Sequence, residues 1–189
     1  TYTYEGTELP FEDWSNKIHS FNDLASIVQT THDAAQSSAI KAINRMQTMR
    51  NWLIGYYIVE FEQHGKDRAE YGAQLLKKLE ERVNRKGVNV TLFKNSRNFY
   101  LHYPQMAENL ISVKSPTLSD QFKTSGKKII SSLSFSHIVE LLTLDDPLAR
   151  YFYEQECIKC TWSVRELRRQ ISTNLYIRAG ISSNPEKML

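Results

Sequence analysis

Polar side chains crowded into one short stretch of chain are the first feature that could do chemistry. Between residues 91 and 98 the sequence has Thr91, Lys94, Asn95, Arg97 and Asn98. Hydroxyl, ammonium, guanidinium and amide groups donate to phosphate oxygens, and Arg and Asn can also pair with the edges of guanine and adenine. We expect this stretch to contact nucleic acid, or else to be an ordinary amphipathic surface helix.

Basic residues are concentrated around this polar stretch. The net charge of the whole chain is only +3, but residues 66–103 include nine Lys or Arg and only four acidic residues. Among them, Lys77, Arg85 and Lys86 precede the polar stretch. Clustered cations bind phosphate backbones through salt-dependent contacts, so we expect these residues to join a DNA-binding surface. Solvated helix faces are the plain alternative.

A second basic group lies near the end of the chain. Arg165, Arg168 and Arg169 follow one another at helical spacing, which makes them neighbours on one helix. Such a row suits phosphates and adds affinity without reading base sequence. The alternative is that these arginines pair with acids of the preceding helix, such as Glu154 and Glu156. The DNA account requires both basic groups to face a common outward surface, with Arg97 and Arg168 not paired with carboxylates beneath it.

No motif of a catalytic site is found. The sequence lacks a Gly-rich phosphate loop, G-x-S-x-G and H-E-x-x-H, and no Lys has an acidic residue two positions before it, as a (D/E)-x-K nuclease would need. Cys157 and Cys160 have C-x-x-C spacing, but no second pair of ligands completes a zinc site. We expect structural thiols, no metal or cofactor, no small-molecule substrate and no enzymatic activity in this chain.

The elements that carry these residues are predicted to be helices. An apolar fraction of 41% with only seven Gly and five Pro favours an all-α fold, which we expect to have six to seven helices. A long helix with one apolar stripe is predicted to end at Gly65; its stripe comprises Ala35, Ala39, Ile43, Met46, Ile54, Ile58 and Phe61. A helix-turn-helix is expected next. It would consist of a second helix over 67–84, a turn over 85–90 and a third helix over 92–103, with Thr91 as the N-cap of the third helix.

The last third is also predicted to be helical. Ser134 or Ser136 begins one helix, Asp146-Pro147 begins another that ends near Cys160, and a capping box, Ser163–Glu166, begins a last helix that reaches about Ala179. The expected organisation is a polar leader (1–31), the long helix with the helix-turn-helix (32–111), a flexible linker (112–132), a C-terminal three-helix unit on the same domain (133–180) and a tail (181–189).

Aromatic residues broaden the stripe of the long helix. Trp52, Tyr56, Tyr57 and Phe61 are spaced for core packing, and that is their plain reading. The alternative is a helical interaction module, in which these aromatics form a homodimer or dock a partner protein. A dimer would also present two helix-turn-helix units, so the two functions are compatible.

The cellular setting follows from what the sequence lacks. No run approaches the ~18 apolar residues needed to span a bilayer, the polar start does not resemble a secretory signal, and two Cys cannot make a disulfide framework. We expect a cytoplasmic protein with no membrane contact. Because the chain does not begin with Met, we expect a processed or excised piece of a longer protein.

Three stretches resemble the amino-terminal domain of the YhcG-type nuclease family of bacteria. They are residues 51–79, with an Ile-Gly and an Ile-Val pair; residues 92–104, similar to R-N-L-x-x-M-R-x-F-Y-x-x-Y-P; and residues 133–176, with Asp146-Pro147 and Trp162 to Ile171. The third stretch is also similar to the L-S-x-x-H…D-P…S-V-R-E-L pattern of ParB-type DNA-binding proteins. The chain departs from the family at 88–95, where a G-F-S-x-R-N type of lead is usual.

The resemblance implies a helical, helix-turn-helix or winged-helix-like DNA-binding domain of undefined function that precedes a restriction-like nuclease domain. That nuclease domain would follow residue 189, and the 181–189 tail would lead toward it. The whole protein would then cut DNA in a defence or mobile-element setting, while this part positions duplex DNA.

Overall fold

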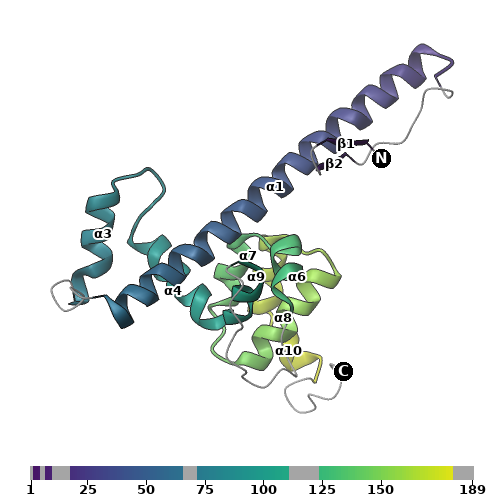
Figure 1. Cartoon of the computed structure of the whole chain (residues 1–189). Helices are drawn as coiled ribbons and strands as arrows, with labels where there is room; N and C mark the ends of the chain where they lie inside the picture. The colour runs from purple at the N-terminus through teal and green to yellow at the C-terminus, as the bar shows by residue number, and fades with distance from the viewer. Residues whose placement is uncertain (1, 5–6, 10–17, 66–71, 111–123, 181–189) are drawn as a thin grey trace. The chain divides into compact units, whose positions relative to one another are not determined.

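The fold is given by a computed structural model, which describes residues 2–4, 7–9, 18–65, 72–110 and 124–180 (Figure 1). The chain divides into two compact units, Thr1–Asn44 and Arg45–Leu189. No helix among the described residues combines the length and the apolar character that crossing a bilayer requires.

The first unit begins with a short antiparallel hairpin, β1 (Tyr2–Tyr4) and β2 (Thr7–Leu9), in which Tyr2 pairs with Leu9. The long helix α1 then begins at Phe21 and ends at His64. The predicted polar leader over 1–31 is therefore shorter than expected, because α1 already begins at Phe21.

Local signals at both ends explain the bounds of α1. The Ser20 hydroxyl accepts a hydrogen bond from the Asp23 backbone N–H (3.1 Å), and the Asp23 carboxylate accepts one from the Ser20 N–H (2.8 Å). This reciprocal cap satisfies donors that the first helical turn leaves unpaired. At the other end the Gly65 N–H donates to the Phe61 carbonyl (2.9 Å), so the predicted end at Gly65 is confirmed.

The second unit contains the last part of α1, the helix α3 (Leu75–Val83) and the helix α4 (Val90–His102). A 3-10 turn, Gly72–Gln74, precedes α3, which begins later than the predicted residue 67; residues 66–71 lie outside the described part. The prediction that Thr91 caps α4 is wrong. Asn89 is the N-cap, and its side-chain oxygen accepts a hydrogen bond from the Leu92 N–H (2.8 Å), which is a preferred role for Asn.

The connection between α3 and α4 bends at two residues with positive φ. Asn84, the C-cap of α3, has φ 42°, and Gly87 has φ 80°. Such left-handed positions favour Asn and Gly. The two helices contact each other across this short connection, and the predicted arrangement of helix, glycine-bearing turn and helix is present.

After α4 the chain forms the 3-10 helix η2 (Pro104–Met106) and the short helix α5 (Ala107–Leu110). The predicted flexible linker over 112–132 is only partly described. Its last third is the helix α6 (Gly126–Ser132), capped by Ser125, whose side chain accepts from the Lys128 N–H. Ile129 of α6 is completely buried, so this part of the expected linker belongs to the core.

The C-terminal helices begin at the predicted caps. They are α7 (Phe135–Leu141) after Ser134, α8 (Pro147–Lys159) after Asp146 and α9 (Val164–Ser172) after Ser163. The last predicted helix is instead two helices, because Asn174 adopts φ 52° and separates α9 from α10 (Leu175–Arg178). A residue in the left-handed region cannot continue a right-handed helix.

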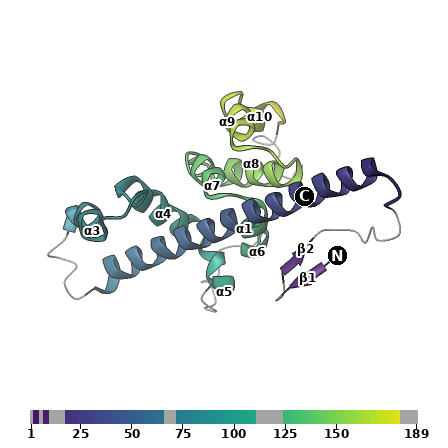
Figure 2. The same cartoon turned by 90° about the horizontal axis from the view of Figure 1, so that it is seen from above.

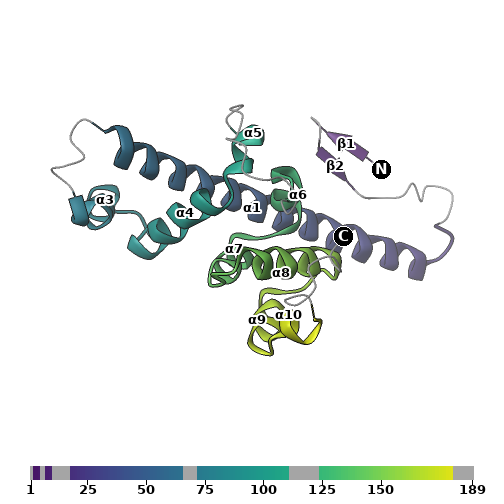
Figure 3. The ribbon, with the colours of Figure 1, turned by 90° about the horizontal axis from the view of Figure 1, so that it is seen from below.

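The helices of the second unit enclose one apolar core, and α7, α8 and α9 contact one another within it (Figures 2 and 3). Its largest fully buried side chains come from six helices and η2, and they include Trp52, Phe99, Met106, Ile129, Ile138, Leu141 and Leu167. The all-α prediction is confirmed. The structure has more helices than the expected six to seven, and the described residues of the second unit contain no strand that could serve as a wing.

A glycine sets the distance between α1 and α4. A Cβ atom at Gly55 would lie 1.9 Å from the carbonyl oxygen of Ser96, so the two backbones are in direct contact. Only a residue without a side chain permits this approach. Trp52 of α1 also packs edge-on against Tyr100 of α4. These contacts hold one face of α4 against α1 and leave the opposite face of α4 outward.

Candidate nucleic-acid interface

The helix α4 carries the residues that the sequence singled out for DNA contact. Thr91, Lys94 and Asn98 are exposed, while Asn95 and Arg97 are half-buried. Between them, Phe93, Ser96 and Phe99 point inward and are buried. α4 therefore has a buried, mainly apolar inner face and a polar outer face.

Three of these polar residues line one hollow. A cavity of about 410 Å³ is bordered by Lys94, Arg97 and Asn98 from α4, by Leu76 from α3 and by Glu62 from α1. A cation, a guanidinium and an amide thus converge on one space. This is the grouping that could receive a phosphate or the edge of a base, but the space also includes a carboxylate that the sequence reasoning missed.

Arg97 is already paired. Its Nε lies 2.7 Å from Oε2 of Glu62, and the two side chains remain 38% and 31% exposed. The pair therefore lies at the surface and not beneath it. Glu62 holds the guanidinium in one orientation and removes part of the positive charge that a phosphate would meet.

The remaining basic residues of this region are accessible to solvent. Lys77 on α3, and Arg85 and Lys86 in the connection before α4, are all exposed. Gly87 permits the turn here, and the Val88 N–H donates to the Arg85 carbonyl (3.0 Å). The connection therefore presents its two cations on a tight, hydrogen-bonded turn.

The second basic group lies on α9, where Arg165, Arg168 and Arg169 are exposed. The expected alternative was pairing with Glu154 and Glu156, but the partners differ. Arg168 forms a bidentate pair with Glu140 of α7, with Nε 3.1 Å from Oε2, while its own side chain is 66% exposed.

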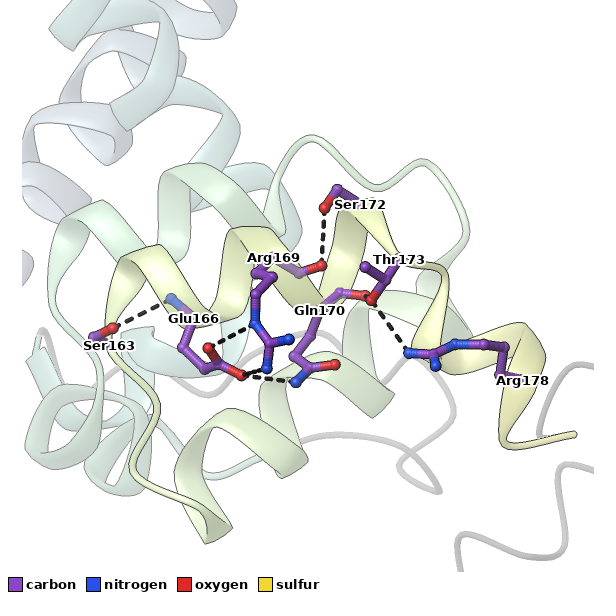
Figure 4. A network of polar contacts seen from close by, with 7 residues as sticks. All are labelled: Ser163, Glu166, Arg169, Gln170, Ser172, Thr173 and Arg178. Carbon is purple, nitrogen blue, oxygen red and sulfur yellow. Dashed lines mark hydrogen bonds and ion pairs between the residues drawn. The ribbon is translucent and has the colours of Figure 1, made fainter.

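Arg169 pairs within its own helix. Its guanidinium donates to both oxygens of Glu166 (3.0 and 2.6 Å), and Oε1 of Glu166 also accepts a hydrogen bond from the Gln170 amide (2.7 Å), as Figure 4 shows. The hydrogen bond from Arg169 holds the pKa of Glu166 below its usual value. Because its carboxylate is engaged here, Glu166 does not complete the predicted capping box, although the Ser163 hydroxyl does accept from the Glu166 N–H (3.2 Å).

Both basic regions belong to the second unit, and α7 contacts both α4 and α9. The region that includes α3, the connection and α4 is called here the α4 surface, and the arginine side of α9 the α9 surface. The Arg97–Glu62 pair is half-buried and Arg168 is largely exposed, so neither arginine is completely enclosed beneath the protein surface.

The aromatic residues of α1 have different surroundings from one another. Trp52 is completely buried, and its Nε1–H donates to the Tyr103 carbonyl (3.0 Å). It is thus a core residue, and the prediction that it could serve an interface is not supported. Tyr56 is half-buried and stacks on Trp52, whereas Tyr57 is 64% exposed.

An apolar hollow of about 550 Å³ separates the end of α1 from α3. Tyr57 and Phe61 line it from α1, and Leu75, Leu79 and Val83 line it from α3. No residue of α3 is fully buried, because the hollow occupies the place where α1 would otherwise cover this helix.

A buried polar cluster was missed from the sequence. The Glu154 carboxylate on α8 is buried and accepts a hydrogen bond from the Thr124 hydroxyl; Tyr103, Gln105 and Arg150 line the adjoining cavity of about 140 Å³. Burial raises the pKa of Glu154 by more than its hydrogen bonds and Arg150 lower it. A single Glu in an amphipathic helix gives no signal of burial, so only the fold could reveal this cluster.

The two cysteines differ in their surroundings. Cys157 is buried and Cys160 exposed, and no disulfide joins them. Burial raises the pKa of the Cys157 thiol to about 11, which makes it a poor nucleophile. Within the part of the chain that the structure describes, no three His, Cys, Asp or Glu side chains are grouped to hold a metal ion.

Comparisons with known proteins identify the family of this chain. The family described as the DUF1016 N-terminal domain matches residues 27–178. The Escherichia coli (strain K12) protein named "Putative nuclease YhcG" is 35% identical over 172 residues, which cover 83% of this chain and 46% of that protein. The chain therefore spans about half the length of this curated relative, and no solved structure matches it at a significant level. On this evidence the chain belongs to the DUF1016 N-terminal domain family of YhcG-type proteins.

Proposed function

We propose that this chain is a non-catalytic domain that positions duplex DNA for a restriction-like nuclease. The pair α3 and α4 would act as a helix-turn-helix, with α4 entering a groove and α3 lying across the backbone. The α9 surface would hold phosphates. The parent protein would cut DNA elsewhere in its length, in the bacterial cytoplasm and in a defence setting.

The observation that carries the proposal is the hollow on α4. Lys94, Arg97 and Asn98 border one space there, which gives a phosphate or a base edge three donors at once. Exposed cations of the connection, Arg85 and Lys86, lie within the same helix-turn-helix. The name of the relative, a nuclease, supports a nucleic-acid partner for the whole protein.

The test is a salt titration of binding to duplex DNA, followed by fluorescence anisotropy. For each phosphate contact, log K against log salt concentration has a slope of about −0.9. Lys94→Ala and Arg165→Ala should each weaken binding and flatten this slope by about one unit. Lys159→Ala, which removes an exposed cation from α8, outside both surfaces, is the matched control and should leave the slope unchanged.

Two results would overturn the proposal. One is an affinity that does not fall with salt, since a polyanion contact must release counterions. The other is equal loss of binding in the Lys159→Ala control, because the effect would then follow from net charge and not from the two surfaces. A (D/E)-x-K motif downstream in the same reading frame would support the nuclease half of the proposal.

A protein-interaction module is the second candidate, and the apolar hollow between α1 and α3 favours it. Exposed Tyr57 and half-buried Leu79 border a space that an apolar side chain of a partner could fill. Such docking predicts association that is insensitive to salt and weakened by Tyr57→Ala, with no binding to DNA. The salt titration therefore distinguishes the two functions.

A further inference from the structure

The first part of α1 carries an uncovered apolar stripe. Between Phe21 and Gln47 no side chain of the helix is buried. Eight exposed residues on one face, seven of them apolar and one a histidine, form what is called here the α1 stripe: Phe21, Leu24, Val28, His32, Ala35, Ala39, Ile43 and Met46. Their spacing of three or four residues keeps them within about 60° of one line along the helix. The large apolar members are between 45% and 83% exposed.

An uncovered apolar face of this length requires a partner. Helices in water obtain most of their stability from packing an amphipathic face and not from intrinsic propensity. Contiguous apolar surface on a protein marks an interaction site. The stripe extends for about 40 Å along the helix, and its side chains with their flanks offer an area approaching the roughly 800 Å² per partner of a standard interface.

The charges of α1 identify the chemistry of the partner. At 100° per residue, Asp23, Lys41 and Arg45 lie about 200° to 240° from Phe21, opposite the α1 stripe, and Asp33 lies about 120° from it, also outside the stripe. The residues beside the stripe, such as Gln29, Thr31 and Ala42, are uncharged. A surface without charge suits neither nucleic acid nor an acidic or basic segment, so the partner must itself be apolar along a helix.

The spacing of the residues along the α1 stripe points to a second copy of this chain as the partner. Its successive spacings are 3, 4, 4, 3, 4, 4 and 3 residues, which is the same series in either direction. An identical helix lying antiparallel therefore matches every position. Phe21 would face Met46, Leu24 would face Ile43, and Val28 would face Ala39. A twofold axis would pass between residues 33 and 34, as an isologous interface requires.

We propose that α1 pairs antiparallel with α1 of a second copy of this chain through the α1 stripe. Small residues near the axis, Ala35 and Ala39, allow close approach of the two helices. The proposal is independent of DNA binding, which it neither requires nor predicts.

Sedimentation velocity of the whole chain over a range of concentrations tests the pairing. We expect a species of twice the 22.0 kDa mass of the chain. Leu24→Glu or Ile43→Glu should raise the dissociation constant at least about tenfold, because each buries two charges in an apolar contact. The matched control is Ile40→Glu, since Ile40 is also 53% exposed on α1 but lies about 100° from the stripe. Circular dichroism should show that all three variants remain helical at high concentration.

Cross-linking determines the orientation. In a Cys160→Ser background, a mixture of Leu24→Cys chains with Ile43→Cys chains should form a disulfide between the two, while neither variant alone should cross-link. Cross-links by Leu24→Cys alone would mean parallel pairing and would overturn the proposal. A chain that stays monomeric at every concentration, or an Ile40→Glu variant that dissociates as readily as Leu24→Glu, would overturn it as well. Neither experiment involves DNA, so a failure of the pairing proposal is distinct from a failure of the proposed DNA-binding function.

Discussion

From Phe21 to Gln47, α1 buries no side chain, whereas from Thr48 to Val59 it buries six: Thr48, Asn51, Trp52, Gly55, Ile58 and Val59. Both parts belong to one continuous helix, and both show apolar residues at helical spacing. The later part is covered because α4 lies directly on it at Gly55. The earlier part has a comparable stripe and no such cover among the described residues of its own unit.

This difference shows which properties of a helix can be predicted from the spacing of its apolar residues. Apolar residues every three or four positions predict a helix with an apolar face, and that much is true of the whole of α1. They do not tell which neighbour covers the face, or whether any does within the same chain. Ala35, Ala39, Ile43 and Met46 have the same spacing as Ile54 and Ile58, yet all four are exposed, whereas Ile54 is half-buried and Ile58 is buried.

The largest effect is expected from Trp52→Ala in the covered part of α1. The change removes a fully buried indole and its hydrogen bond to the Tyr103 carbonyl. Truncation of a buried aromatic costs about 4 kcal/mol of unfolding free energy. Chemical denaturation followed by circular dichroism measures the loss. Tyr57→Ala, one turn further on but exposed, should cost less than about 0.5 kcal/mol; comparable losses would contradict the assignment of Trp52 to the core.

The second effect is expected from Gly55→Ala. The new methyl group would collide with the Ser96 carbonyl at 1.9 Å, and because that atom is backbone, α1 and α4 must move apart. We expect a loss of about 3 kcal/mol in unfolding free energy, as in a strongly overpacked core. Ser37→Ala in the exposed part of α1 is the control and should be close to neutral. A stable Gly55→Ala protein would mean that the two helices are not in contact.

A smaller effect, and an increase, is expected from Glu62→Gln. The amide keeps the shape of the side chain but removes the carboxylate that pairs with Arg97 (2.7 Å). If α4 binds DNA as proposed, the released guanidinium should raise affinity about threefold to tenfold at low salt, an effect that salt reduces. Asp33→Asn removes an acid from the exposed part of α1 and should change affinity little. An unchanged affinity in Glu62→Gln would exclude Arg97 from the DNA contact.

The smallest effect on stability is expected from protonation of Asp23, which caps the exposed N-terminal part of α1. Hydrogen bonds from Ser20 and from the His19 backbone hold the pKa of Asp23 below its usual value of 3.8. A lowered pKa means that the charged cap stabilises the helix above about pH 3.8 and that this contribution is lost as pH falls through the lower, folded value. Amide NMR shifts of Ser20 to Leu24 in an acid titration would report fraying there first. Asp23→Ala should abolish this acid response, and an identical response in that variant would contradict the assignment.

The helix ends were the most predictable part of the fold. Ser134, Asp146 and Ser163 each cap a helix through a bond to a residue two or three positions away, so the signal lies within a few letters of sequence. The same rule failed at Thr91, because Asn89 is an equally good cap two residues earlier. It also failed at Asn174, where a single left-handed residue divides a helix whose neighbours all favour continuation.

The partners of the basic residues were not predictable. Glu62 and Glu140 are remote in sequence from Arg97 and Arg168 and come from other helices. Nothing in the spacing of either acid marks it as a partner, since such pairs arise only when helices pack. The sequence therefore identified which residues of α4 and α9 face outward, and the fold determined how much of their charge is already neutralised.

The surface ion pairs have a consequence for selectivity. A ligand that approaches Arg97 or Arg168 must compete with the carboxylate that pairs with that arginine, Glu62 or Glu140. A lone phosphate or a mononucleotide gains little from such an exchange, because one contact replaces another of similar strength. A long duplex makes many exchanges together and releases its counterions at each. Under the proposed function, affinity should therefore rise steeply with the length of the duplex, and free nucleotides should be poor competitors.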